Sequence, residues 1–184
     1  AFQEAARRFA GLGMTGDQAA AQLFAGEALY AQGDHRSASD IWKATLSLEK
    51  SLTPMDRASL RFDYGINLKE LGEYEESLAS SRMAVEFFQA LGKTTEELLA
   101  RSEVASVHIM RRDPLSALDE LNLGLARSRE AGRPDMEARL LQRLGLVSWD
   151  LGDDDAAAEQ WRQALPLLRA AGNRVAEGAV LNLL

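Results

Sequence analysis

The stretch that decides the fold is GLVSWDLGDDDAAAEQWRQA, residues 145–164. A small residue stands in an apolar helical segment, a Gly152-Asp153 turn follows, and Ala157 and Trp161 continue at helical spacing. The same order recurs as GEALYAQGDHRSASDIWKAT, residues 26–45. Glycine tolerates the left-handed backbone that ends a helix, and an acidic residue suits the start of the next one. Each stretch therefore predicts two helices joined by a tight turn.

The turn repeats along the chain with a period near 40 residues. Its members are Gly33, Gly72, Arg112 and Gly152, which lie 39, 40 and 40 positions apart. A second register, expected to contain helix C-caps, consists of Gly13, Thr53, Gly92, Gly132 and Gly172. Small residues recur in the first helix of each unit, at Gly26, Gly65, Ala105 and Gly145. A fixed period of this length is typical of a repeat protein, with helices of roughly 16 to 18 residues.

Composition agrees with an all-α fold. The 184 residues include 30 Ala and 29 Leu but only 3 Ile and 6 Val, so strand-forming aliphatic residues are scarce. The chain has no Cys and two His, which excludes disulfide frameworks and thiol nucleophiles and leaves few metal ligands. The net charge of −7 opposes nucleic-acid binding, because phosphate recognition needs a basic face. No apolar run is long enough for a membrane helix.

These positions resemble the tetratricopeptide repeat (TPR) family. Its pattern is a small residue in helix A, a Gly-acidic-aromatic turn, and then Ala, an aromatic residue and Ala along helix B. Gly65 with Gly72-Glu73-Tyr74, and Gly145 with Ala157 and Trp161, carry the likeness. The 40-residue period resembles the long-helix variety of bacterial transcription activators and signal-transduction ATPases. The resemblance implies a right-handed α-solenoid of antiparallel helix pairs.

The phase of the period predicts a single array over residues 1–184. We expect helix B of a partial repeat at 1–13, repeats at 14–53, 54–92, 93–132 and 133–172, and a truncated helix A at 173–184. The stretch Ala179–Leu184 is apolar where solenoids usually carry a polar cap. We therefore expect a fragment of a longer array, or an open end that another copy covers.

The predicted binding surface is the side of each helix A that points away from helix B, which we call the A-helix face. Residues at i, i+4 and i+7 share one side of a helix, and in a TPR-like array this side lines the inner curve. The predicted peptide-binding groove consists of Glu27, Tyr30, Phe62, Ile66, Lys69, Ser102, Ser106, Ile109, Gln142, Leu146 and Trp149. Leu23 shares its columns, and Asp63, Glu70 and Arg143 lie at its edges. The alternative is that these side chains pack on adjacent repeats.

Other motifs favour structural interpretations. Gly11-Leu12-Gly13-Met14-Thr15-Gly16 matches a dinucleotide fingerprint but follows helical rather than strand periodicity. Asp153-Asp154-Asp155 is explained by helix capping, and neither His35 nor His108 has a catalytic constellation around it. The Lys and Asn clamp by which some TPR proteins bind a carboxylate is absent from these columns. We predict no cofactor, no metal and no catalytic residue.

The predicted function is a non-enzymatic scaffold, bacterial and cytoplasmic, that binds a protein or peptide segment in its groove without contacting nucleic acid or a membrane. Self-association through the apolar C-terminal end is a further possibility. The alternative is an effector-sensing regulatory module of a larger signalling ATPase or transcription activator. An array resembling TPR-based response-regulator phosphatases would need an accessory helical bundle, for which the sequence gives no sign.

Overall fold

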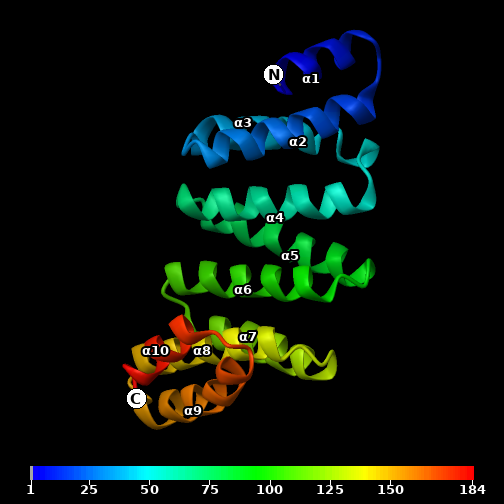
Figure 1. Ribbon diagram of the computed structural model, residues 1–184. Helices are drawn as coiled ribbons and strands as arrows, with labels where there is room; N and C mark the ends of the chain where they lie inside the picture. Colours follow the sequence, from blue (N-terminus) through cyan, green and yellow to red (C-terminus); the bar gives the residue numbers. More distant parts are fainter. Residues whose placement is uncertain (1) are drawn as a thin grey trace. The chain divides into compact units, whose positions relative to one another are not determined.

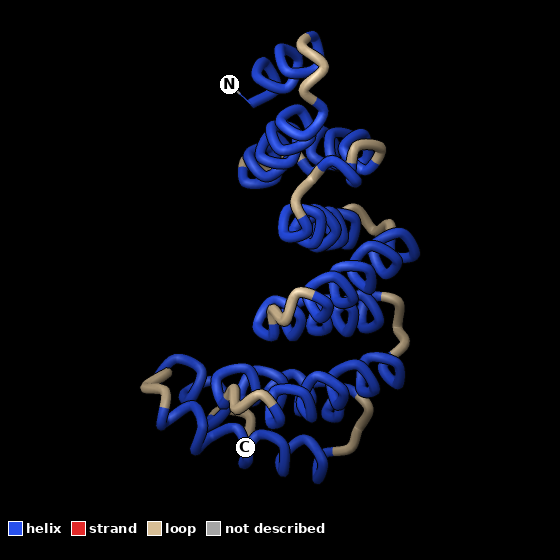
Figure 2. The backbone as a smooth tube through the Cα atoms, turned by 90° about the vertical axis from the view of Figure 1, so that its right-hand side faces the viewer, coloured by secondary structure: helices blue, strands red, loops and turns tan. Residues whose placement is uncertain are grey.

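The computed structural model describes residues 2–184 and is entirely helical over that range (Figure 1). The helices are α1 (Phe2–Gly11), α2 (Thr15–Ala31), α3 (His35–Leu46), η1 (Glu49–Ser51), α4 (Pro54–Glu70), α5 (Tyr74–Ala90), α6 (Thr94–Met110), α7 (Pro114–Glu130), α8 (Pro134–Asp150), α9 (Asp154–Ala170) and α10 (Arg174–Leu181). Short loops join them, and no strand occurs among the described residues (Figure 2). The all-α prediction is confirmed.

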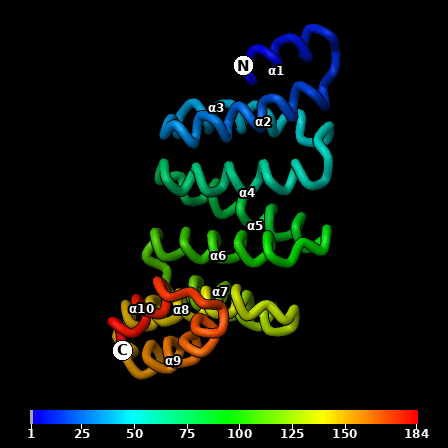
Figure 3. Tube along the Cα trace, in the orientation of Figure 1, coloured from blue at the N-terminus to red at the C-terminus, as the bar shows by residue number. Residues whose placement is uncertain are grey.

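The helices fall into two compact units, Ala1–Lys93 with α1 to α5 and Thr94–Leu184 with α6 to α10. Within each unit every α-helix packs on the next α-helix in sequence. The order can be traced in Figure 3, where the colour changes from blue to red along the chain. The helices that we expected to be first helices also meet, α2 with α4 in the first unit and α6 with α8 in the second. Contacts between helices adjacent in the chain are what repeat architectures use to bury their apolar faces.

Glycine occupies the turns because the backbone there is left-handed. The φ angles of Gly33, Gly72 and Gly152 are 78°, 80° and 79°. At the first of these turns the Gly33 amide donates to the Tyr30 carbonyl at 2.9 Å, which satisfies an otherwise unpaired helix-end carbonyl. The equivalent Arg112 has φ 58° without the freedom of glycine.

Acidic side chains cap the helices that follow these turns. The carboxylates of Asp34, Asp113 and Asp153 accept from backbone amides three residues later at 3.1, 3.2 and 3.0 Å. Such caps satisfy amides that have no partner within the helix. The interpretation of the three-acid run at 153–155 as a capping feature is confirmed for Asp153. Glu73 makes no side-chain cap bond.

The first helix pair departs from the expected lengths. The helix α3 has 12 residues and is followed by the short 3-10 helix η1. Thr53, expected to be a C-cap, is instead the N-cap of α4 with φ −60° and ψ 156°. Its hydroxyl accepts from the Asp56 amide at 3.2 Å, and Pro54 follows at the first helical position. The expectation was wrong because threonine favours extended backbone and N-capping over the left-handed conformation.

The small residues of the first helices allow close contact with bulky residues of the second. A Cβ atom added to Gly26 would overlap the Trp42 indole, and one added to Gly145 would overlap the Trp161 indole. Both indoles are buried, and Trp42 Nε1 donates to the Leu23 carbonyl at 3.2 Å. The assignment of both tryptophans to core packing is confirmed.

Candidate binding site

A pocket lies between α2 and α4 in the first unit. Its lining consists of Glu27, Tyr30, Trp42, Asp63 and Ile66, and its cavity volume is about 80 Å³. Glu27 and Tyr30 lie one turn apart on α2, and Asp63 and Ile66 lie one turn apart on α4, so each pair shares one side of its helix. The structure thus brings three residues of the predicted groove together around one cavity, which we call the α2–α4 pocket.

The two carboxyl groups of the pocket lie in an environment that disfavours their charge. Burial raises the pKa of Asp63 from 3.8 to about 7, with the negative charge of Glu27 as the second cause. The pKa of Glu27 is also raised, first by burial and then by the charge of Asp56. No described residue forms a hydrogen bond or an ion pair with either Glu27 or Asp63. Acids of this kind are stabilised when a positive charge comes close to them.

Aromatic rings form the other wall of the pocket. The Tyr30 ring lies 6.1 Å from the Trp42 ring at an interplanar angle of 41°, and 5.1 Å from His35 in an edge-on arrangement. The His35 backbone carbonyl accepts from the Asn67 side chain at 2.9 Å, which ties α3 to α4. The pocket wall is therefore fixed by contacts outside the pocket.

Sequence reasoning placed Asp63 only at the edge of the groove and Trp42 only in the core. A signal was present for the first, because Asp63 stands between two aromatic residues, Phe62 and Tyr64, on α4. A charged residue at such a position is unusual unless it is paired or functional.

The remaining predicted residues of the first unit make intramolecular contacts. The Phe62 ring meets the Phe88 ring edge-on at 6.1 Å between centroids. The Lys69 ammonium lies 3.6 Å from the Glu70 carboxylate. Leu23, in the same columns, is buried in the core. None of these three lines the α2–α4 pocket.

In the second unit the corresponding columns are partly filled by an arginine. The Arg143 guanidinium of α8 donates to the Ser102 carbonyl of α6 at 2.8 Å and to the Ser106 hydroxyl. Ser102 is buried, Ile109 packs on the core cluster of this unit, and the Gln142 carbonyl accepts from Trp161 Nε1 at 3.4 Å. In contrast, Leu146 and Trp149 are 43% and 53% exposed on α8. The structure thus leaves these two apolar side chains at the surface.

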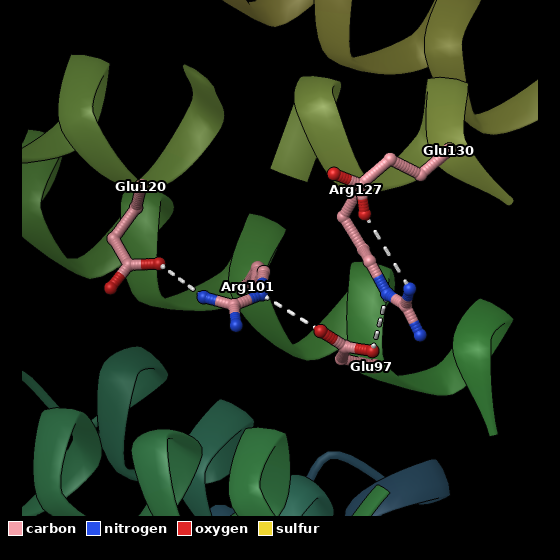
Figure 4. A network of polar contacts seen from close by, with 5 residues as sticks. All are labelled: Glu97, Arg101, Glu120, Arg127 and Glu130. Carbon is pink, nitrogen blue, oxygen red and sulfur yellow. Dashed lines mark hydrogen bonds and ion pairs between the residues drawn. The ribbon is translucent and has the colours of Figure 1, made fainter. Parts of the chain in front are cut away.

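An ion-pair network centred on the buried Glu97 joins α6 and α7 and was not predicted from the sequence (Figure 4). Glu97 is 1% exposed, and its carboxylate lies 3.2 Å from Arg101 and 3.4 Å from Arg127. Glu120 pairs with Arg101 at 3.3 Å, and Glu130 pairs with Arg127 at 3.7 Å. Of these contacts, Glu97 with Arg101 and Arg127 with Glu130 have the helical spacing that sequence can reveal, whereas the two contacts between the helices do not. The two guanidinium groups neutralise Glu97, so the network joins two helices.

Residues 2–184 contain no cluster of three or more His, Asp or Glu side chains arranged to hold a metal ion. Within the same range no helix is both long and apolar enough to span a lipid bilayer.

Solved structures with the same arrangement of helices are numerous, although no family model and no curated protein matches the sequence. Aspartyl phosphate phosphatase F from Bacillus subtilis superposes with a TM-score of 0.82 at 13% identity, over 99% of this chain and 48% of that one. A Rap protein complexed with competence and sporulation factor gives a TM-score of 0.68 at 16% identity, over 92% of this chain and 47% of that one.

A third solved structure indicates the type of repeat. It is a signal transduction ATPase with numerous domains and a tetratricopeptide repeat sensor, from Pyrococcus horikoshii, with a TM-score of 0.72 and 16% identity. The match covers 89% of this chain and 25% of that one. The chain has a TPR-like fold.

This TPR-like chain spans about half the length of the phosphatase and of the Rap protein. At 13 to 16% identity the likeness concerns the fold. What the chain binds must therefore be argued from its own side chains.

Proposed function

We propose that this TPR-like chain is a non-enzymatic interaction module that binds a protein segment on its A-helix face. The observation that carries the proposal is the α2–α4 pocket, where Glu27, Tyr30 and Ile66 meet on the face from which such arrays can bind. A concave site with an apolar wall and a few converging polar groups is typical of a binding site.

Two further features support the proposal. Leu146 and Trp149 are exposed on α8, at the columns that Ile66 and Lys69 occupy on α4. Tryptophan is among the residues that contribute most to protein interfaces. The Rap protein with the same fold was crystallised with competence and sporulation factor, so the architecture is compatible with ligand binding.

Selection from a displayed library of random peptides tests the proposal, followed by affinity measurement with face variants. We expect Ile66→Ser or Trp149→Ser to weaken the selected peptides about tenfold, since each removes an apolar anchor from its unit. Leu123→Ser is the matched control, because Leu123 is 58% exposed but lies on α7. The proposal fails if no peptide is selected, or if Leu123→Ser weakens binding as much as the face variants do.

A second candidate is an effector-sensing module of a larger signalling ATPase. It is favoured by the likeness to the signalling ATPase with a repeat sensor, of which this chain matches a quarter. The full reading frame discriminates between the two, because a nucleotide-binding domain in the same polypeptide is required only by the sensor.

A further inference from the structure

Glu27 and Asp63, the partly buried acids of the α2–α4 pocket, differ from Glu97 and Glu49 in lacking a cation. Glu97 is held by two arginines, and the half-buried Glu49 forms a two-point pair with Arg61, with one contact at 2.6 Å. Glu27 and Asp63 have no such partner among residues 2–184. An unpaired carboxylate in a partly buried site is costly, and either a bound proton or a positive charge from outside relieves that cost.

The size and lining of the pocket restrict what the cation is. The cavity volume of about 80 Å³ is well below the roughly 300–1,000 Å³ of sites that enclose a drug-sized molecule, so the pocket suits a single side chain. Tyr30 and Ile66 offer aromatic and apolar surface beside the two acids, and the buried Trp42 forms the floor of the pocket. Such surface packs against the aliphatic stem of lysine or arginine, and aromatic rings attract the charged head. A divalent metal ion would need about six oxygen ligands and no apolar wall.

We infer that the α2–α4 pocket receives the cationic side chain of a lysine or arginine in the segment that binds the A-helix face. The inference rests on the proposed function and makes it more specific. The side chain enters along Tyr30 and Ile66, and its head lies between the carboxylates of Glu27 and Asp63. Recognition of one basic residue by two acids gives specificity, because a neutral or acidic side chain would leave both acids unpaired.

Single amino-acid probes test the pocket without a known partner. The probes are N-acetyl-arginine amide and N-acetyl-lysine amide, and the matched control is N-acetyl-norleucine amide, which has the stem without the charge. Binding is followed by two-dimensional nitrogen–proton NMR of the chain. We expect saturable shifts of the Glu27, Asp63 and Ile66 amides and of the Trp42 indole with the two cations, and none with norleucine.

Two variants test whether the charge of Asp63 is needed for binding of the cationic probes. Asp63→Asn keeps the shape of the side chain and removes its charge, and we expect it to weaken both cationic probes five- to tenfold. Asp40→Asn, which neutralises an exposed carboxylate on α3, is expected to leave the affinity unchanged. The NMR spectrum of each variant shows whether it is folded. Equal binding of norleucine and arginine, or no effect of Asp63→Asn, would overturn the inference, as would tighter binding of magnesium than of either probe.

Peptides from the library selection separate this inference from the proposed function. We expect replacement of one Lys or Arg in a selected peptide by norleucine to weaken it, and Asp63→Asn to remove that difference. Selected peptides that bind the A-helix face but ignore both changes leave the proposed function intact and refute the basic-residue pocket. If the cationic probes bind and no peptide does, the occupant is not part of a protein segment and the inference is refuted.

Discussion

Replacement of Asp63 by asparagine is expected to stabilise the protein, and the gain should depend on pH. In the folded chain the pKa of Asp63 is raised from 3.8 to about 7, first by burial and then by Glu27. The free energy that corresponds to this difference between the unfolded and folded pKa values is about 4 kcal/mol, because each tenfold change in an equilibrium constant is about 1.4 kcal/mol. The pocket mouth admits solvent, which reduces the penalty, so we expect a gain of about 2 to 4 kcal/mol at pH 8.

The sign follows from proton linkage. A carboxyl whose pKa is higher in the folded state binds protons more tightly there, so its contribution to stability is most favourable at low pH. That contribution is lost as the pH rises from about 4 to about 7, between the unfolded and folded values of Asp63. Asparagine carries no charge at any pH. The advantage of Asp63→Asn should therefore be near zero at pH 4, grow to pH 7 and stay constant above it.

Urea unfolding at half-unit steps from pH 4 to pH 8 measures this difference. Subtracting the free energy of unfolding of the wild type from that of the variant cancels groups that titrate equally in both. Asp40→Asn, on the exposed side of α3, should give a difference within about 0.5 kcal/mol at every pH. A flat difference for Asp63→Asn, or a variant less stable than the wild type at pH 8, would refute the account of Asp63 as a buried acid without a cation.

Three more outcomes are expected in urea or thermal unfolding. Gly145→Ala should lower the free energy of unfolding by about 1 to 3 kcal/mol, because the new Cβ overlaps the Trp161 indole. Gly178→Ala is the control, because no described atom lies within 4 Å of the added Cβ, and it should raise the free energy of unfolding by up to about 1 kcal/mol. Equal effects of the two substitutions would contradict the close helix contact. Glu97→Gln should lower the free energy of unfolding by about 2 to 3 kcal/mol, because two arginines lose their shared counter-charge. Replacement of the exposed Glu130 by Gln should change it by less than about 0.5 kcal/mol. If Glu97→Gln left stability unchanged, the network would not contribute to stability. Arg112→Gly should raise the free energy of unfolding by about 1 kcal/mol, because glycine adopts the φ of 58° without strain. A lower free energy of unfolding would show that the Arg112 side chain contributes more than the backbone strain costs.

Local interactions made most of the fold predictable. Helix ends depend on residues within one turn, so the glycines at positions 33, 72 and 152 and the capping aspartates were readable from sequence. The first helix pair was predicted less well, because the 40-residue period does not show whether Thr53 ends the preceding helix or caps the following one.

The sequence by itself determined the helices, their turns and the columns of the A-helix face, because these depend on spacing along the chain. Only the tertiary structure decided which of those columns line a pocket. It brought Glu27 and Asp63 to one pocket 36 positions apart in sequence, and it brought Arg143 to the serines of α6. It also paired Glu97 with Arg127, which is 30 positions away. Burial and charge pairing depend on distance in space, and spacing within one helix carries no information on either.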